Sequence, residues 1–168
     1  MEPGVARLTP LVNTHTHTAL CGHGEGTVGE LVGAACRAGV SVLAVTEHFP
    51  LSDAFNPNHD EAMPASSVEG YLAAIEEARA EHPGIEVFSG CEMDWLGALE
   101  DRSVAERDTS RFEVVLGSVH FVDGWGCDNE DNAGPWLEAG SPDRIWERYV
   151  EEWCAMATSS ERFDVLSH

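Results

Sequence analysis

The chain has 168 residues, of which 43% are apolar and 8% aromatic, and this is enough for one folded domain with a substantial core. Its 30 acidic residues face nine arginines and no lysine, and the formal net charge of −21 argues against a nucleic-acid-binding protein, because binding a phosphate backbone requires basic side chains. No apolar run approaches the roughly 20 residues of a membrane helix, so we expect no membrane span.

The first ten residues, MEPGVARLTP, carry charges of both signs and two prolines and contain no apolar segment. They do not resemble a secretory signal, and we therefore expect a cytoplasmic protein. The five cysteines are odd in number, irregular in spacing and contain no Cys-x-x-Cys pair, which favours reduced thiols.

Strand and helix patterns alternate from the start of the chain. A short apolar segment at 11–13 leads into the stretch HTHTALCGHGEG. The following TVGELVGAACRAG predicts a helix, because Thr27 and Glu30 have the spacing of a capping box and Gly39 suits a helix end. The β-branched run SVLAVTEH is typical of a buried parallel strand.

The same alternation continues in the middle of the chain. After a loop rich in proline, asparagine and aspartate, Ser66 and Glu69 predict a second capping box before the helical segment GYLAAIEEARAEH. The strand pattern IEVFSGCE follows, and after it we expect a short helix around Leu99 to Arg107.

The last third of the chain contains two more strand patterns, FEVVLGSVH and FDVLSH. Between them, Ser141 with Pro142 at the first helical position predicts a fourth helix to about Thr158. We interpret DNEDNAGPWLEAGSPD, whose spacing does not match a calcium-binding EF-hand loop, as a solvated loop at the rim of a pocket.

Five strands in alternation with helices predict an α/β fold with parallel strands. In barrels of this class the loops at the carboxyl ends of the strands converge on one pocket, where catalytic groups lie. The five apolar segments lead, in chain order, to His15 and His17, His48, Glu92, His120, and His168.

His15 and His17 are two residues apart, so in an extended segment both imidazoles point to the same face and are able to share a cation. An H-x-H pair alone is weak support for a metal site, since a structural role accounts for it about as well. His23 follows in a glycine-rich loop that is able to fold back, and its presence favours metal binding.

A single histidine at the end of an apolar strand is more often a core residue than a ligand. His48, His120 and His168 occupy equivalent positions after three different strands, however, and this repetition favours a shared metal site. Glu92 follows a strand and a glycine, and a carboxylate buried there needs a cation or several hydrogen bonds. It is therefore a candidate bridging ligand, with a salt-bridged acid as the alternative.

Other polar residues near these positions have weaker claims. Glu25, Glu47 and Asp94 are candidates to orient the ligands or donate a proton, and we take Asp94 with Glu92 as the candidate catalytic acids. The remaining residues we interpret without a role in the chemistry: Cys21 as packing, and His59 and His82 as exposed.

Several other hydrolytic chemistries lack their motifs in this sequence. There is no G-x-S-x-G nucleophile elbow, no G-x-x-x-x-G-K-[ST] phosphate loop and no H-E-x-x-H helix. Covalent serine catalysis and P-loop chemistry are therefore disfavoured.

The segments HTHTALCGHGEG, LAVTEHFP, SGCEMDW, VVLGSVHFV and FDVLSH, in this order, resemble the successive motifs of the PHP (polymerase and histidinol phosphatase) superfamily. The segment Thr18 to Gly26 narrows the resemblance to the PHP-type histidinol-phosphatases. The resemblance runs from about Leu11 to His168. It implies a distorted (β/α)7 TIM-like barrel, formed as a single PHP domain.

The resemblance also implies a centre of three divalent metal ions, which would be zinc, iron or manganese. Within it, His15 and His17 would bind the first metal and His23 and His48 the second. His120 and His168 would complete the third with Glu92, which would also bridge to another metal. The implied function is hydrolysis of L-histidinol phosphate, a small phosphate ester, in histidine biosynthesis.

The sequence departs from the family pattern after FDVLSH, because it contains no later Asp-x-His motif. We therefore expect an incomplete barrel of about five β/α units, the N-terminal part of a longer enzyme. Its open strand edges would favour a homo-oligomer. Two alternatives to a histidinol-phosphatase stay open: a PHP phosphoesterase acting on nucleotides or sugar phosphates, and an inactive metal-binding fragment.

Overall fold

The computed structural model describes residues 10–97, 108–128, 133–138 and 142–168. Its centre is a five-stranded parallel sheet whose strands are hydrogen-bonded in chain order. The strands are β1 (Leu11–Asn13), β2 (Val40–His48), β3 (Glu86–Asp94), β4 (Val114–Ser118) and β7 (Val165–Leu166). This confirms all five strand patterns read from the sequence.

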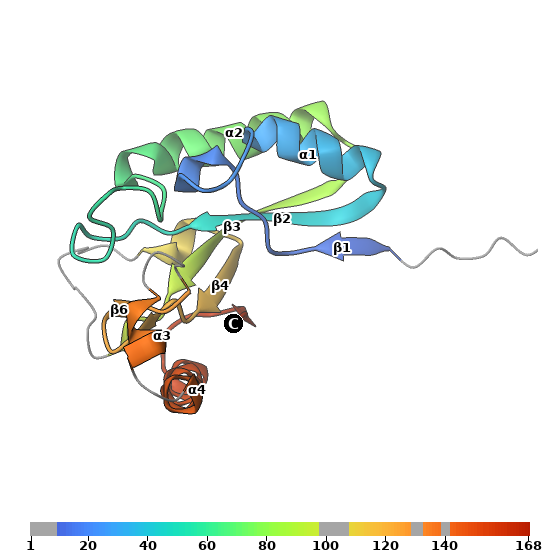
Figure 1. Ribbon diagram of the computed structural model, residues 1–168. Coiled ribbons are helices and arrows are strands. Elements are labelled where there is room, and N and C mark those ends of the chain that lie inside the picture. Colours follow the sequence, from blue (N-terminus) through green and yellow to red (C-terminus); the bar gives the residue numbers. More distant parts are fainter. Residues whose placement is uncertain (1–9, 98–107, 129–132, 139–141) are drawn as a thin grey trace, which may run out of the picture.

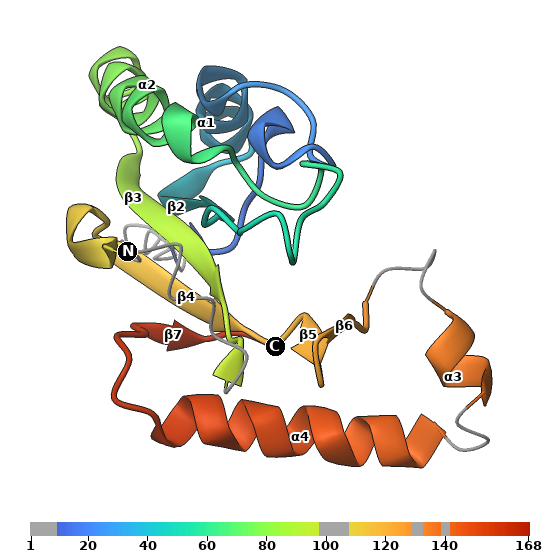
Figure 2. The same cartoon turned by 90° about the vertical axis from the view of Figure 1, so that its left-hand side faces the viewer.

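The sheet curls into half of a TIM-like barrel, with helices on its outside. The helices α1 (Val28–Arg37) and α2 (Val68–Glu81) lie side by side next to β2 and β3 (Figure 1). Helix α4 (Pro142–Thr158) runs along the other end of the sheet, next to β4 and β7 (Figure 2). The incomplete barrel predicted from the sequence is therefore confirmed.

Helix α1 has the ends that its sequence predicts. Thr27 accepts a hydrogen bond from the backbone N–H of Glu30, and the Glu30 side chain accepts one from the backbone N–H of Thr27, so both halves of the capping box form. After the helix, Gly39 has φ +78°, a left-handed conformation that glycine adopts without steric cost. The helix and the strand that follows are thus separated by a tight turn.

The capping box predicted at the start of α2 is wrong. A 3₁₀ turn, η2 (Ala65–Ser67), contains Ser66, and the α-helix begins at Val68, where its cap residue Ser67 makes no side-chain capping hydrogen bond. Because Ser66 belongs to this turn, its hydroxyl does not have the position of a helix cap.

Helix α3 (Gly134–Glu138) and the strands β5 (Phe121–Val122) and β6 (Trp125–Gly126) were not predicted. The segment 128–143, interpreted as a solvated loop, includes helix α3 and the start of α4, so that interpretation is wrong in part. The strands β5 and β6 pair as an antiparallel hairpin directly after His120. The helix expected around 99–107 lies outside the described residues.

The core lies between the sheet and helices α1 and α2, where Val32, Leu43, Val45 and Ile75 are buried. Tyr71 of α2 is also buried, and its hydroxyl lies 2.7 Å from the carbonyl oxygen of Val45 and 2.8 Å from that of Gly90. This phenol joins the helix to neighbouring strands and thereby holds β2 and β3 in register. Among the described residues, no helix has the length and apolar character needed to cross a membrane.

Candidate metal centre

The carboxyl ends of the five parallel strands meet at one edge of the sheet. His48 is the last residue of β2 and lies directly across from Glu92 on β3. His120 and His168 follow β4 and β7, and the HTHT segment follows β1. Residues far apart in the sequence are therefore brought together by strand order alone.

Thr16 determines how His15 and His17 point. Its backbone N–H donates to Thr46 Oγ1 at 2.9 Å, its hydroxyl donates to the Ala44 carbonyl at 2.8 Å, and the Thr46 N–H donates to its carbonyl at 3.0 Å. Because Thr16 is bonded toward β2, the residues on either side of it face the opposite direction. The rings of His15 and His17 accordingly lie on one side, 5.1 Å apart.

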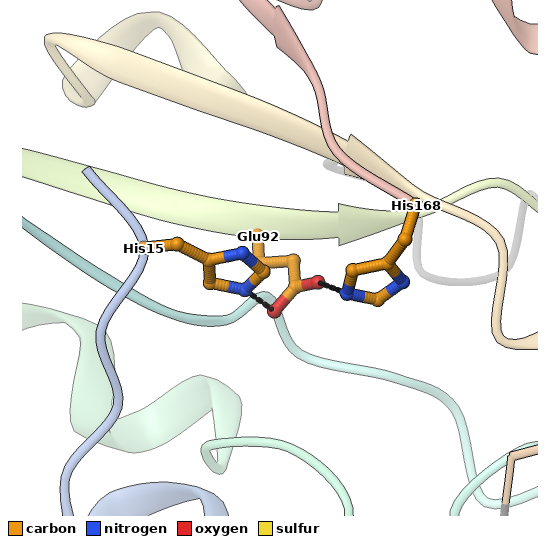
Figure 3. Close-up of side chains that lie close together, drawn as sticks. All are labelled: His15, Glu92 and His168. Atoms are coloured by element: carbon orange, nitrogen blue, oxygen red, sulfur yellow. Dashed lines mark hydrogen bonds and ion pairs between the residues drawn. The ribbon is translucent and has the colours of Figure 1, made fainter. Parts of the chain in front are cut away.

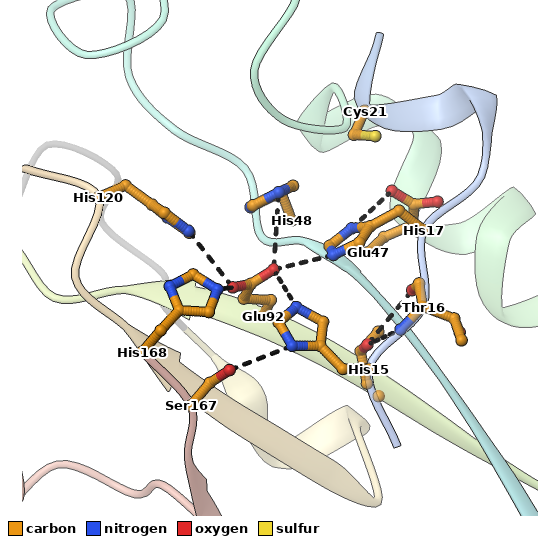
Figure 4. Close-up of polar contacts among 12 residues, drawn as sticks. His15, Thr16, His17, Cys21, Glu47, His48, Glu92, His120, Ser167 and His168 are labelled. Atoms are coloured by element: carbon orange, nitrogen blue, oxygen red, sulfur yellow. Dashed lines mark hydrogen bonds and ion pairs between the residues drawn. The ribbon is translucent and has the colours of Figure 1, made fainter. Parts of the chain in front are cut away.

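Glu92 is the centre of this cluster. It is 1% exposed, and five imidazole Nε2 atoms surround its carboxylate (Figure 4). The distances are 2.9 Å from His15 and 3.0 Å and 3.6 Å from His17 and His48, all to Oε2, and 3.5 Å from His120 and 3.3 Å from His168, both to Oε1. His15 and His168 thus approach different oxygens of the same carboxylate (Figure 3).

The opposite ring nitrogens face other parts of the protein. His120 Nδ1 lies 2.6 Å from the buried Asp94 Oδ1, and His15 Nδ1 lies 3.1 Å from the hydroxyl of Ser167. His17 Nδ1 lies 3.9 Å from Oε2 of Glu47. In these three imidazoles, therefore, Nε2 points to the centre and Nδ1 points to an oxygen outside it.

The pKa values reflect this arrangement of charges. Burial alone would raise the pKa of Glu92, but hydrogen bonds from His15, His168 and His17 hold it far below its usual range. Burial would lower the pKa of His120, but Asp94 outweighs burial by its charge and hydrogen bond, and the pKa rises to about 9. The cluster is therefore built around a permanent negative charge.

His17 and His48 differ although their rings stack 4.4 Å apart. Burial would lower the pKa of His17, but the nearby Cys21 thiol, the bond to Glu92 and the charges of both nearby glutamates raise it to about 9. At His48 burial prevails over the charges of Glu92 and Asp94, and the pKa falls to about 4. His48 is thus a neutral imidazole at neutral pH, which is the form that binds metals.

The donor set fits divalent cations that prefer nitrogen and oxygen ligands. Three groups of donor atoms each lie within 4.8 Å of one another around the centre: His15, Glu92 and His168; His17, His48 and Glu92; and His48, Asp94 and His120. Glu92 belongs to two of these groups, as a bridging carboxylate would. How the ligands divide among individual metals stays a prediction.

A cleft of about 470 Å³ opens beside the cluster. His23, His48, Asp94 and His120 are among the residues that line it. Its lining also includes the aromatic pair Phe55 and Phe121, with ring centroids 5.1 Å apart, and three acids, Asp60, Glu61 and Asp128. No arginine is among the described residues that line it.

The structure brings together most of the residues singled out in the sequence. His23 is exposed, and its ring lies 5.1 Å from that of His48 at the cleft. Cys21 is buried, as predicted, beside His17 and Glu47. His59 is exposed as predicted, whereas His82 is half-buried, and its ring lies close to Gly33 of α1, so that prediction is wrong.

Sequence reasoning missed Ser167, Phe55 and Phe121. Ser167 contacts an imidazole 152 residues away in the chain, and no local pattern marks such a contact. The two phenylalanines line the cleft from the loop after β2 and from β5. Their positions follow from loop conformation, which periodicity does not describe.

Comparison with known proteins identifies the family of this fold. The model of the PHP domain matches residues 13–168. A probable histidinol-phosphatase of Deinococcus radiodurans is 31% identical over 164 residues, which are 96% of this chain and 61% of that protein. A probable phosphatase of Clostridium acetobutylicum is 27% identical over 67% of this chain and 41% of its own length.

Solved structures agree on the fold. Histidinol phosphate phosphatase from Lactococcus lactis, crystallised with zinc, L-histidinol and phosphate, superposes with a TM-score of 0.66 at 17% identity, covering 94% of this chain and 57% of that one. A crystal structure from Listeria monocytogenes, described as a "putative histidinol phosphatase", gives a TM-score of 0.57 at 21% identity, covering 73% of this chain and 50% of that one. The chain spans less than two thirds of the length of these relatives. It belongs to the PHP domain family.

Proposed function

We propose that the protein containing this domain hydrolyses a small phosphate monoester. We propose L-histidinol phosphate as its substrate and histidine biosynthesis as its pathway. The observation that carries the proposal is the convergence of five imidazole Nε2 atoms on the buried carboxylate of Glu92, beside a cleft of about 470 Å³. The similarity to a probable histidinol-phosphatase supports the choice of substrate.

The charge of the cleft supports a metal-dependent reaction. Asp60, Glu61 and Asp128 line it, no arginine is among its described lining residues, and the chain has a net charge of −21. An anionic phosphate would be repelled from such a surface unless cations dominate the local potential. When bound, divalent ions would activate a water molecule and neutralise the charge of the phosphoryl oxygens.

The residues of this chain have separate tasks in the proposed reaction. The histidines around Glu92 would hold up to three ions of zinc, iron or manganese, with Glu92 bridging two of them. Asp94 would hold His120 through its Nδ1 at 2.6 Å while facing the cleft. Water attacks phosphorus, the ester P–O bond breaks, and the alcohol leaves with a proton, so no phospho-enzyme is needed.

Release of inorganic phosphate from histidinol phosphate tests this function. We expect turnover that stops after exhaustive removal of metal with a chelator and returns when zinc or manganese is added. A nucleoside monophosphate and a sugar phosphate, compared by kcat/KM, are the matched controls. Activity that survives metal removal would contradict the mechanism, and a tenfold preference for the nucleotide would contradict the substrate.

A further inference from the structure

Glu47 is a buried carboxylate whose environment the proposed chemistry does not explain. It precedes His48 in β2 and is 0% exposed. Its Oε1 accepts hydrogen bonds from the backbone N–H and the hydroxyl of Thr18, the residue after the H-x-H pair. This first oxygen therefore ties the end of β2 to the segment that carries His17.

The second oxygen of Glu47 points to His17. Glu47 Oε2 accepts no hydrogen bond among the described residues, and it lies 3.9 Å from His17 Nδ1, which also forms none of standard geometry there. The thiol of Cys21 is the third group at this point, and it donates to the carbonyl oxygen of Thr18 at 3.2 Å. A buried carboxylate oxygen and a buried imidazole nitrogen thus face each other (Figure 4).

Burial makes this pairing costly unless a proton joins the two atoms. A carboxylate oxygen withdrawn from water without a donor loses its hydration with no compensation. An imidazole bound to a metal through Nε2 carries its proton on Nδ1, and that N–H is the donor Glu47 Oε2 needs. His17 Nε2 already points to the centre, 3.0 Å from Glu92 Oε2.

The same arrangement recurs within the cluster. Asp94 Oδ1 lies 2.6 Å from His120 Nδ1, and the hydroxyl oxygen of Ser167 lies 3.1 Å from His15 Nδ1. Glu47 differs from Asp94 in one respect, because it is not among the residues that line the cleft. It has no access to a substrate there, and any effect on catalysis must pass through His17.

We propose that Glu47 is a positioning residue of the metal centre: it accepts the Nδ1 proton of His17 and so keeps Nε2 free and directed at the metal. This inference rests on the metal centre of the proposed function. It assigns to Glu47 two tasks, one for each oxygen, of which only the bond from Oε2 to His17 acts on metal binding.

The test separates these two tasks by substitution. Glu47→Gln keeps the volume, and its amide oxygen still accepts from Thr18, but an NH₂ group then faces His17 Nδ1. Thr18→Val removes the hydroxyl that donates to Oε1 and accepts from the Leu20 N–H at 3.4 Å, and it leaves the bond from the Thr18 backbone N–H to Oε1. Glu113→Gln is the distant control, because Glu113 bonds Ser89 and Arg79 away from the cluster.

Two measurements on the zinc-loaded protein are decisive. Competition with a chelator gives the Zn²⁺ affinity, and nuclear magnetic resonance of ¹⁵N-labelled histidine gives the Nδ1–H signal of His17. We expect Glu47→Gln to weaken Zn²⁺ binding about 10- to 100-fold and to abolish a slowly exchanging Nδ1–H signal. Thr18→Val should lower the melting temperature but retain that signal, and Glu113→Gln should retain the Zn²⁺ affinity.

Three outcomes would overturn the inference. Equal losses of Zn²⁺ affinity and of the signal in Glu47→Gln and Thr18→Val would mean that Glu47 only anchors the loop. If Glu47→Gln does not fold, the exchange rate of the His17 Nδ1–H in the wild-type protein is the test. Exchange as fast as that of the exposed His59 would show that this N–H has no buried acceptor. A wild-type protein that binds no Zn²⁺ would overturn the metal centre itself, and this inference with it, whereas Zn²⁺ binding without histidinol phosphate turnover would leave it standing.

Discussion

Replacing Glu92 with glutamine is expected to reduce metal affinity far more than replacing Asp94 with asparagine. Glu92 is 1% exposed and lies within 3.6 Å of five imidazole Nε2 atoms, so it is the common contact of the cluster. Asp94 Oδ1 lies 2.6 Å from His120 Nδ1, the nitrogen of that ring that faces away from Glu92. The two substitutions remove one negative charge each but differ in the number of ligands affected.

The magnitudes follow from these contacts. Removing one partner of a buried, hydrogen-bonded charge pair costs about 3–5 kcal/mol, which is roughly 100- to 4000-fold in affinity at 1.4 kcal/mol per factor of ten. Removing a carboxylate that only orients a liganding histidine costs about 10- to 100-fold in affinity or activity. We therefore expect the Glu92 variant to retain less metal than the Asp94 variant at any free zinc concentration between the two dissociation constants.

Elemental analysis after dialysis against a zinc buffer measures this difference directly. The variants are prepared side by side with the wild-type protein, and circular dichroism establishes that each is folded before its metal content is compared. Glu113→Gln, a carboxylate substitution outside the cluster, should keep the wild-type metal content. Equal losses in the two variants, or a larger loss for Asp94→Asn, would refute the identification of Glu92 as the bridging ligand.

Three further predictions concern stability and association. Gly117→Ala should lower the free energy of unfolding in urea by about 1–3 kcal/mol, because its Cβ would lie 2.6 Å from Phe163 Cδ1 and 3.0 Å from Met156 Sδ. Gly29→Ala is the control and should not lower it, because no atom lies within 4 Å of the new Cβ. Equal losses in the two variants would contradict the packing argument. Zinc at 100 times its dissociation constant should stabilise the folded protein by about 2.7 kcal/mol, seen as a higher melting temperature that excess chelator reverses; no change in melting temperature on adding zinc would count against the site. The mass measured by light scattering should rise with protein concentration, because Val12 and Val165 on the edge strands β1 and β7 are 50% and 39% exposed. Val12→Lys should suppress this rise. A mass that does not depend on concentration would show that these edges do not associate.

The strands β2, β3 and β4 could be predicted because parallel strands inside a sheet are buried on both faces. Such strands read as continuous apolar runs, and the last residues of β2 and β3 are buried as the sequence indicated. The hairpin of β5 and β6 could not be predicted, since two-residue strands are too short to show any period. Helix α3 has only five residues, and its flanking acids and glycines indicated a loop.

The meeting of the histidines and Glu92 at the strand ends could also be predicted, because strand polarity alone places them at one edge. The partners of their Nδ1 atoms could not. Glu47 and Asp94 were candidates among several acids, and only the structure distinguishes them from Glu25, which is exposed. These contacts depend on side-chain rotamers and on loop paths, neither of which leaves a periodic signal in the sequence.

The position of Glu92 has a consequence for how the domain opens. Its five imidazole neighbours come from the ends of β1, β2, β4 and β7, so each of the other strands of the sheet contributes to the one carboxylate on β3. Without a shared ligand, we expect the edge strands to detach independently and their amides to exchange with solvent faster than those of the central strands. A cation held by this cluster would contact residues from several strands at once. The separate openings of these strands would then become one cooperative event, because no strand could detach without releasing the metal.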